Sequence, residues 1–361
     1  MDKINIKLDI ESKKVLKKLP DAHKALAELK GIAETIPNQQ ILINTLVLQE
    51  AKDSSEVENI VTTNDEIFKA ELDISKNISI ATKEVQNYST AMKKGFALVK
   101  ENRILTNNII LEIQSELEKN NAGFRKLPGT ALKNNKGETV YTPPQDANEI
   151  KSLMSDLEKF INDDSLCDWN DLVKMAVVHY QFESIHPFYD GNGRTGRIIN
   201  ILYLIKQNLL KIPILYLSRY INQNKALYYR LLQSIRDNEG WEDWILYVLD
   251  AIEKTSLQTI NMINDIRELM FSYKQIIREK LPKIYNQDLL NNLFNHPYTK
   301  IEFLMSDLQV NRLTASRYLN KLVEIGLLEK RKIGRSNYYI NNPLILIFSK
   351  DYSLKRKNDK N

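Results

Sequence analysis

The chain has 361 residues, 43% of them hydrophobic and 27% charged, which is enough for two or three domains with buried cores. Its net charge of +5 is too small to indicate a nucleic-acid-binding protein by itself. The single cysteine, Cys167, excludes an internal disulfide framework, and we expect neither a membrane span nor a signal peptide. Because Gly and Pro are sparse, at 11 and 10 residues, we expect a cytoplasmic and mainly α-helical protein.

The first third of the chain carries apolar residues at helical spacing. A short alternating stretch over residues 4–8 comes first, and Pro37 marks the start of a second helix. Helices are predicted over residues 22–29, 37–51, 67–75, 79–99 and 107–117.

Residues 54–59, Ser-Ser-Glu-Val-Glu-Asn, have two interpretations. Taken locally, Ser55 and Glu58 have the Ser-x-x-Glu spacing of a capping box, which is a common start of a helix. The second interpretation depends on a family resemblance that is described below.

Residues 123–144 carry the clearest hairpin signal in the chain. Gly129 and Gly137 favour turns, Val140 and Tyr141 favour a strand, and the proline pair that begins at Pro143 ends it. We therefore expect a β-hairpin here.

The stretch from His186 to Arg197, His-Pro-Phe-Tyr-Asp-Gly-Asn-Gly-Arg-Thr-Gly-Arg, concentrates groups that act on phosphates. Apolar helical patterns flank it, so it opens onto a helix N-terminus, where unpaired N–H groups and the helix dipole favour an anion. Arg194 and Arg197 can each bind phosphate oxygens with two N–H groups. Asp190 suits Mg²⁺, and His186, with an ordinary pKa of about 6.5, suits proton acceptance. These residues predict a nucleotide-phosphate site with a general base.

Other patterns in this region do not change that prediction. Gly191, Gly193 and Gly196 have the spacing of a dinucleotide fingerprint, but a helix precedes them and no acidic residue follows at the required distance. We expect His179 to be a packed structural residue and Phe188 to be an apolar anchor of the loop. No histidine has the neighbours of a zinc site.

The loop resembles the signature of Fic-domain proteins, His-Pro-Phe-x-Asp-Gly-Asn-Gly-Arg-x-x-Arg, at every fixed position. The resemblance implies a mainly α-helical Fic core with a β-hairpin flap, and an enzyme that transfers AMP from ATP to a protein hydroxyl group. In this family the flap holds a target peptide by strand addition, and residues 123–144 are similar to it. A surface hairpin without a role is the alternative.

The same resemblance implies roles for single residues. His186 would be the catalytic base, and Asp190 would hold Mg²⁺ against the phosphates of ATP. Family members place an aromatic residue against adenine, and Tyr229 would be that residue here. The expected ATP-binding residues are Gly191, Asn192, Gly193, Arg194, Thr195, Gly196, Arg197 and Tyr229.

In Fic-domain proteins a helix with the pattern Ser/Thr-x-x-x-Glu-Gly/Asn holds the active site shut. Ser54, Glu58 and Asn59 fit that pattern and precede the loop. The resemblance therefore implies an N-terminal inhibitory helix in which Glu58 pairs with Arg197. Such a pair would remove the cation that receives the γ-phosphate.

The pattern changes near Pro282, after helices expected over residues 194–209, 225–238 and 251–280. Helices over 288–294, 301–308 and 312–325, followed by two strands around Gly334, resemble a winged helix-turn-helix. Residues 353–361 have the composition of a disordered tail. The side chains expected to face DNA are Arg312, Thr314, Arg317, Lys321, Lys330, Arg331, Lys332 and Arg335. A winged helix that contacts protein or dimerises is an equally good interpretation.

We therefore expect an N-terminal helical region (residues 1–105), a Fic core (106–280) and a winged-helix domain with a tail (281–361). Expected partners are ATP, a target protein, DNA at the winged helix and a second copy of the chain. Two alternatives stay open: a Fic enzyme that removes AMP or transfers another phosphate-linked group, and a DNA-binding regulator whose site senses ATP.

Overall fold

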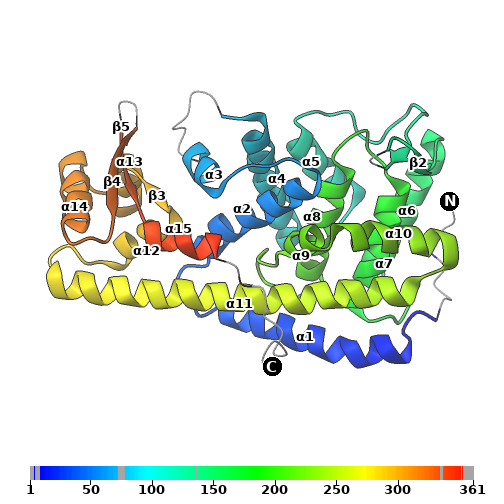
Figure 1. Cartoon of the computed structure of the whole chain (residues 1–361), viewed down its shortest axis with the longest axis horizontal. Coiled ribbons are helices and arrows are strands. Elements are labelled where there is room, and N and C mark those ends of the chain that lie inside the picture. The colour runs from blue at the N-terminus through cyan, green and yellow to red at the C-terminus, as the bar shows by residue number, and fades with distance from the viewer. Residues whose placement is uncertain are drawn as a thin grey trace.

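The computed structural model describes residue 4, residues 9–71, 78–134, 136–333 and 336–350, and residue 352. Three predicted segments lie outside the described residues, namely residues 5–8 of the alternating stretch, the Gly334 turn with Arg335, and the tail over residues 353–361. The described residues form helices and two small antiparallel sheets, so the prediction of a mainly α-helical fold is confirmed (Figure 1). None of the described helices is long and apolar enough to cross a membrane.

The described residues from Lys13 to Glu118 form five helices, four in the N-terminal region and the fifth at the start of the core. Their bounds are α1 (Lys13–Ala33), α2 (Gln40–Val57), α3 (Asn64–Ala70), α4 (Ile80–Asn102) and α5 (Asn107–Glu118). The capping-box interpretation of Ser55 and Glu58 is wrong, because α2 ends at Val57 instead of starting there. Ser55 is buried in the last turn of α2 and Glu58 is its C-cap.

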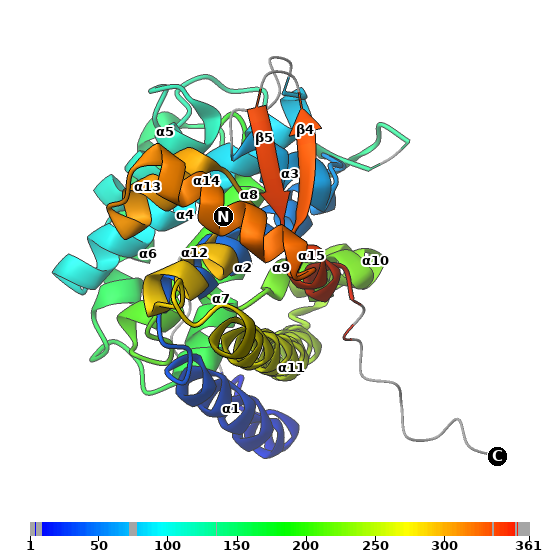
Figure 2. The same ribbon diagram turned by 90° about the vertical axis from the view of Figure 1, so that its left-hand side faces the viewer.

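The central region holds the small flap sheet and the helices that surround residues 186–197. Its elements are β1 (Leu132–Lys133), β2 (Thr139–Tyr141), α6 (Ala147–Asn162), α7 (Asp171–Ile185), α8 (Asn192–Lys206), α9 (Leu217–Gln223), α10 (Lys225–Asn238) and α11 (Trp241–Lys280). Nearly every residue of α7 and α8 is buried, so these two helices form the centre of the core. The long helix α11 starts at Trp241, ten positions before the predicted start at Ala251. Helix α1 packs along α11 (Figures 1 and 2).

The C-terminal region has the order of helices and strands that the sequence predicted. Its elements are α12 (Gln287–Asn295), β3 (Tyr298–Thr299), α13 (Ile301–Leu308), α14 (Arg312–Glu324), β4 (Glu329–Ile333), β5 (Ser336–Ile340) and α15 (Asn342–Ser349). The strands form an antiparallel sheet in the order β3-β5-β4, in which Glu329 pairs with Ile340 (Figure 2). The short strand β3 and the helix α15 were not predicted.

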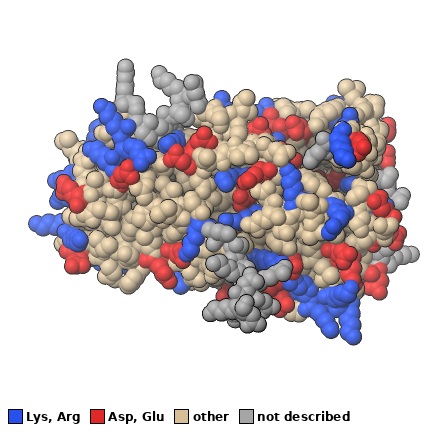
Figure 3. Space-filling view, viewed as in Figure 1, with Lys and Arg blue, Asp and Glu red and all other residues tan. Residues whose placement is uncertain are grey.

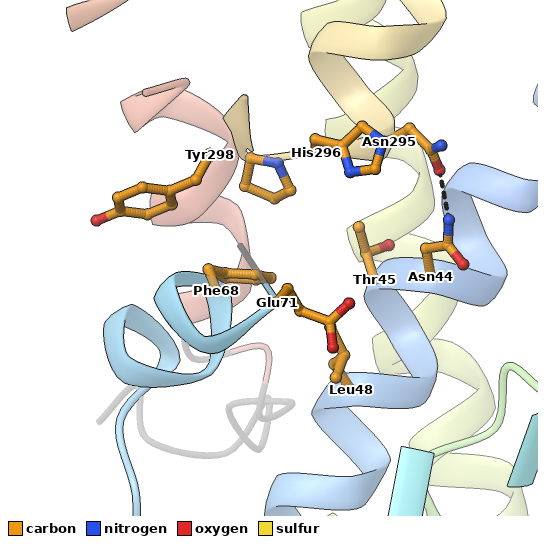
Figure 4. Close-up of a pocket in the computed structure, with 9 residues that line it drawn as sticks. Asn44, Thr45, Leu48, Phe68, Glu71, Asn295, His296 and Tyr298 are labelled. Atoms are coloured by element: carbon orange, nitrogen blue, oxygen red, sulfur yellow. Dashed lines mark hydrogen bonds between the residues drawn. The ribbon is translucent and has the colours of Figure 1, made fainter. Parts of the chain in front are cut away.

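This C-terminal region packs directly on helices α2 and α3. Asn44 of α2 donates to the side chain of Asn295 over 2.8 Å (Figure 4). The Tyr298 hydroxyl donates to Asp65. The rings of Phe68 and Phe348 lie 5.7 Å apart. A pocket remains between the two parts (Figure 4). Its lining includes Thr45, Leu48, Glu71 and His296. The helix that carries residues 54–58 therefore contacts the C-terminal region at its other end.

Candidate active site

The loop between α7 and α8 reverses direction at two residues with a left-handed backbone. His186 ends α7 with φ of 49°, and its N–H donates to the Phe182 carbonyl over 2.9 Å. Gly191 precedes α8 with φ of 74°, a conformation that strongly favours glycine. The first backbone hydrogen bond of α8 runs from Thr195 to Gly191, so the helix N-terminus faces the loop, as the sequence predicted.

Internal contacts fix the shape of this loop. The Phe188 side chain is fully buried, with its ring 5.4 Å from Phe124 and 6.3 Å from Phe182, so its predicted role as an anchor is confirmed. The Asn192 side chain accepts from the Phe188 N–H over 2.8 Å and donates to the Phe188 carbonyl over 2.9 Å. The Asn192 side chain therefore closes the loop, and only its backbone N–H is available for a phosphate.

Arg125 is a component of the site that the sequence did not reveal. Its side chain is 1% exposed and donates to the carbonyl groups of His186 at 2.8 Å, Ile185 at 3.3 Å and Pro144. Its backbone N–H donates to the Pro187 carbonyl over 2.8 Å. Arg125 thus connects the end of α7 to the chain that leaves the predicted flap. No local signal marks it, because its partners are all backbone carbonyls far away in the sequence.

His179, within α7, and His186, at the C-cap of α7, have different surroundings. Burial, reinforced by nearby Arg125, lowers the pKa of His186 to about 4, so this imidazole is neutral at physiological pH. A neutral imidazole can accept a proton. His179 is buried, bonds to the Tyr228 hydroxyl at 2.8 Å and stacks on Trp244. Its predicted structural role is confirmed.

Glu58 lies against the first turn of α8, next to Gly193. A Cβ atom built on Gly193 would lie 2.4 Å from Glu58 Oε1 and 3.0 Å from Arg197 Nη1. A carboxylate thus stands where a helix N-terminus favours an anion. Burial opposes its charge, yet the neighbouring Arg197 guanidinium outweighs that effect and holds the pKa of Glu58 below its ordinary value.

Arg197 is buried and bonded to the end of α2. Its Nη2 donates to Glu58 Oε1 over 2.8 Å and to the Ser54 carbonyl over 3.0 Å, and its Nε donates to Ser54 Oγ over 2.8 Å. We call these bonds the Arg197 pairing. Asn59 terminates α2 with φ of 64° and accepts from Lys225 over 2.9 Å. The structure therefore brings Ser54 and Glu58 to the loop, whereas Asn59 contacts α10.

Arg194 is also paired, which the sequence did not reveal. It is 4% exposed and donates to Glu84 of α4 over 2.6 Å and to Glu118 of α5 over 2.9 Å. Glu118 Oε1 lies 2.3 Å from the position of a Cβ atom on Gly191, so only glycine fits there without a shift. In this state both arginines of the loop already have carboxylate partners.

The remaining predicted residues surround the same loop. Thr195 is fully buried, and a Cβ atom on Gly196 would lie 2.6 Å from Glu183 Oε1. Burial raises the pKa of Glu183 to about 7. Tyr229 is 46% exposed and packs with its ring edge on Tyr228.

Asp190, which the sequence predicts to hold a metal ion, is exposed. Its Oδ1 accepts from the Gly191 N–H over 2.7 Å, which leaves Oδ2 for a cation. Within the described parts of the chain, no group of three His, Cys, Asp or Glu residues could hold a metal. One carboxylate suits Mg²⁺ that arrives with a nucleotide, because Mg²⁺ commonly takes its other ligands from phosphates and water.

The predicted hairpin is present but short. Strands β1 and β2 pair antiparallel, and Val140 is 45% exposed. The Tyr141 hydroxyl donates to the Ser184 carbonyl over 3.0 Å, and the Arg236 guanidinium lies 3.8 Å from the centre of its ring. These contacts hold β2 next to the end of α7, two residues before His186.

The fold and the loop define a helical protein in which a neutral histidine stands beside an anion-binding helix N-terminus. The Fic/DOC family model matches residues 104–204, and the Fic/DOC family N-terminal model matches residues 16–97. A third model, described as protein adenylyltransferase SoFic-like, C-terminal domain, matches residues 269–344. The chain belongs to the Fic family, which confirms the resemblance seen in the sequence.

Curated relatives match only the central part of the chain. Proteins named Protein adenylyltransferase Fic from Drosophila erecta and Drosophila melanogaster are each 28% identical over 113 residues. That segment is 31% of this chain and 21% of each fly protein, so the match spans about a fifth of the length of these relatives.

Solved structures match over a larger share of the chain. A Fic family protein from Desulfovibrio desulfuricans has a TM-score of 0.57 at 19% identity, covering 91% of this chain and 96% of that one. A Fic-domain signaling protein from Bacteroides thetaiotaomicron has a TM-score of 0.54 at 16% identity, covering 68% and 97%. Fic-1 from C. elegans has a TM-score of 0.51 at 17% identity, covering 69% and 72%. At these identities the likeness shows a shared fold.

Proposed function

We propose that this protein is a protein adenylyltransferase that transfers AMP from ATP to a Ser, Thr or Tyr hydroxyl group of a target protein and of itself. The observation that carries the proposal is the neutral His186 next to the N-terminus of α8, where Glu58 now holds the place of an anion. The fly relatives, which carry the name protein adenylyltransferase, support it.

In the proposed reaction His186 accepts the proton of the target hydroxyl group. The hydroxyl oxygen attacks the α-phosphorus of ATP, the bond to the bridging oxygen of the β-phosphate breaks, and pyrophosphate leaves. The N–H groups at Gly191, Asn192 and Gly193 would donate to phosphate oxygens where negative charge increases.

The cations of the site would bind the rest of the triphosphate. Asp190 would hold Mg²⁺, which would neutralise negative charge on the phosphates. Arg197 would separate from Glu58 and bind the γ-phosphate. Arg194 would separate from Glu84 or Glu118 and bind the β-phosphate. Thr195 and Gly196 complete the first turn of α8, and Tyr229 would lie against adenine.

We further propose that Glu58 inhibits the enzyme from within the chain. While the Arg197 pairing persists, the γ-phosphate lacks its cation, and the triphosphate would take an orientation unsuited to in-line attack. Ser54 supports the pairing, and Asn59 ends α2 in the geometry that directs Glu58 to the loop.

Intact mass spectrometry after incubation with ATP and Mg²⁺ tests the proposal. The samples are the wild type, Glu58→Gly, and Glu58→Gly combined with His186→Ala. We expect AMP adducts to form fast on the Glu58→Gly protein, slowly on the wild type, and at a rate lowered by orders of magnitude on the protein that also carries His186→Ala. Adducts that form equally fast after His186→Ala would show that His186 is not the base. The absence of adducts from all three proteins, also with cell extract as a source of targets, would reject the transferase.

The exposed face of α14 and β4 favours a second role, in DNA binding. Lys and Arg side chains gather at the end of the molecule that α14 and β4 form (Figure 3). Arg317, Lys330 and Lys332 are among the exposed residues, whereas Arg312 pairs with Glu302 and Arg331 with Glu329. Binding to duplex DNA that weakens steeply with salt would support this role, and salt-independent or absent binding would reject it.

A further inference from the structure

A buried carboxyl group lies on the same helix as the Arg197 pairing. Glu50 of α2 is 3% exposed, four residues before Ser54 and eight before Glu58. Residues at this spacing lie on one side of a helix. Figure 1 shows α2 running from the C-terminal region toward α8. By its position in the sequence, Glu50 lies near the middle of α2.

Glu50 connects α2 to two other helices. Its Oε2 accepts from the Ser218 N–H of α9 over 3.2 Å, and its Oε1 accepts from the Ser218 hydroxyl group. The Tyr88 hydroxyl of α4 donates to the same Oε1 over 3.3 Å. Ser218 and Tyr88 are both fully buried, so water does not replace these bonds. The Ser218 N–H also belongs to the first turn of α9, where it has no partner within its own helix.

The charge state of Glu50 suits this role. Burial raises the pKa of its carboxyl group to about 8, so the group is mostly neutral at pH 7. A neutral carboxyl group and the amide of glutamine have nearly the same shape. Either can accept from the Ser218 N–H with one oxygen and donate from its other end to the Ser218 or Tyr88 hydroxyl group, because a hydroxyl group both donates and accepts. Glutamine is therefore the conservative replacement, and leucine, which has a similar size, removes every hydrogen bond.

We propose that Glu50 is a positioning residue that sets the depth and rotation of α2, and thereby decides whether Ser54 and Glu58 reach Arg197. The idea rests on the proposed inhibition by Glu58 and adds the device that holds it in place. Arg197 offers a fixed set of N–H groups, so a small turn of α2 misaligns Ser54 and Glu58 together. The hydrogen bonds of Glu50 to α4 and α9 oppose that turn.

A purely structural role for Glu50 makes a different prediction. If Glu50 only completes the core, its loss should disturb α4, α8 and α9 and slow AMP transfer whether or not Glu58 is present. If it positions α2, its loss should speed transfer only where Glu58 is present. The comparison between the two backgrounds separates these roles.

The experiment uses the full chain with Glu50→Gln, Glu50→Leu and the control Gln49→Leu, each with and without Glu58→Gly. Gln49 is a neighbouring buried residue of α2 whose amide nitrogen has no hydrogen-bond partner. The measurements are the rate of AMP incorporation and hydrogen exchange of the amides in residues 40–57.

We expect Glu50→Leu to raise AMP incorporation about tenfold when Glu58 is present, from the loss of several buried hydrogen bonds, and to change it by less than about twofold beside Glu58→Gly. Exchange at the end of α2 should accelerate in the same variant. Glu50→Gln and Gln49→Leu should stay close to the wild type in both measurements.

Three results would overturn the proposal. Glu50→Leu with the wild-type rate and unchanged exchange would show that Glu50 does not position α2. Slower transfer in both backgrounds would show a general role in the core. Equal activation by Gln49→Leu would show that any leucine in this part of α2 has the effect. If Glu58→Gly itself transfers no AMP, the proposed function fails, and the exchange measurement alone still decides whether Glu50 positions α2.

Discussion

Glu58 and Arg197 form an ion pair with 2.8 Å between Oε1 and Nη2, although they are far apart in the chain. Arg197 is 1% exposed and Glu58 is 35% exposed, so the pair has a buried side and a side open to solvent. The partly exposed carboxylate of Glu58 is therefore the partner that can move. This asymmetry suits a contact that must break for a nucleotide to take the place of the carboxylate.

Glu58→Gly should raise AMP transfer about tenfold or more, because the variant loses a hydrogen bond between charged groups. Solvent weakens this bond, since the Glu58 carboxylate is partly exposed. The measurement is the initial rate of adduct formation by mass spectrometry. Glu56→Gly is the matched control, because it places the same residue two positions earlier and breaks only a 3.9 Å contact with Lys52. Equal activation by both variants would mean that a flexible end of α2, rather than the lost carboxylate, releases the site.

His186→Ala in the Glu58→Gly protein should lower the rate by about 10²- to 10⁴-fold, the usual contribution of a general base. Because the pKa of His186 is lowered to about 4, its neutral form prevails above that value. The rate of the Glu58→Gly protein should therefore be flat from about pH 5 to 8 and fall below this range. Glu58 raises the pKa of His186 slightly, so removal of Glu58 should move the fall in rate to a lower pH. A rate that halves near pH 6.5 would contradict the buried environment.

Asn59→Val should weaken inhibition, whereas Asn59→Gly should preserve it. The left-handed backbone at Asn59 costs a residue with a Cβ atom about 1–2 kcal/mol, and valine is less tolerant than asparagine. Both variants lose the 2.9 Å bond from Lys225, so their difference isolates the backbone conformation. The measurement is the basal rate of AMP transfer in each variant. Equal rates for the two variants would show that Glu58 does not depend on this turn.

Arg125→Met should lower both stability and transfer. The variant leaves the carbonyl groups of His186, Ile185 and Pro144 without their buried donor, which costs about 2 kcal/mol or more. Thermal unfolding should show a fall of several degrees in Tm, and transfer by the Glu58→Gly protein should fall with it. Lys126→Met, at the neighbouring exposed position, should change neither. An unchanged Tm in Arg125→Met would show that the loop keeps its shape without this side chain.

Asp190→Asn should raise the Mg²⁺ concentration needed for half-maximal transfer by about tenfold or more, because an amide NH₂ group, which does not bind a hard cation, replaces the free carboxylate oxygen. Asparagine retains an oxygen that can accept from the Gly191 N–H, so the loop should keep its shape. The measurement is a Mg²⁺ titration in the Glu58→Gly background. The same half-maximal concentration in both proteins would exclude Asp190 as the metal ligand.

Most helices could be predicted from periodicity, and the misses have physical reasons. The sequence predicts the long helix α11 only from Ala251, although it starts at Trp241, because the first part of α11 is buried on most of its sides and lacks a clear polar face. The helix α9 has seven residues, too few to show a period. Around residues 54–59 a short local pattern indicated a helix start, although α2 ends there.

The sequence by itself determined the loop and its chemistry. His186, Asp190 and the glycines before α8 lie in one short stretch, so their spacing follows from covalent connectivity and from the local rules of turns and helix ends. The resemblance to Fic-domain proteins depended on the same stretch. It also pointed to Glu58, because the inhibitory pattern is itself local.

Only the tertiary structure decided which groups meet this loop from elsewhere. Arg125 at the His186 carbonyl, and Glu84 and Glu118 at Arg194, come from segments without a signature, and their roles depend on how helices pack. The same is true of Glu50, whose partners lie on α4 and α9. Helix packing is set by the burial of many apolar side chains together, so no short pattern in the sequence encodes which polar groups it brings into contact.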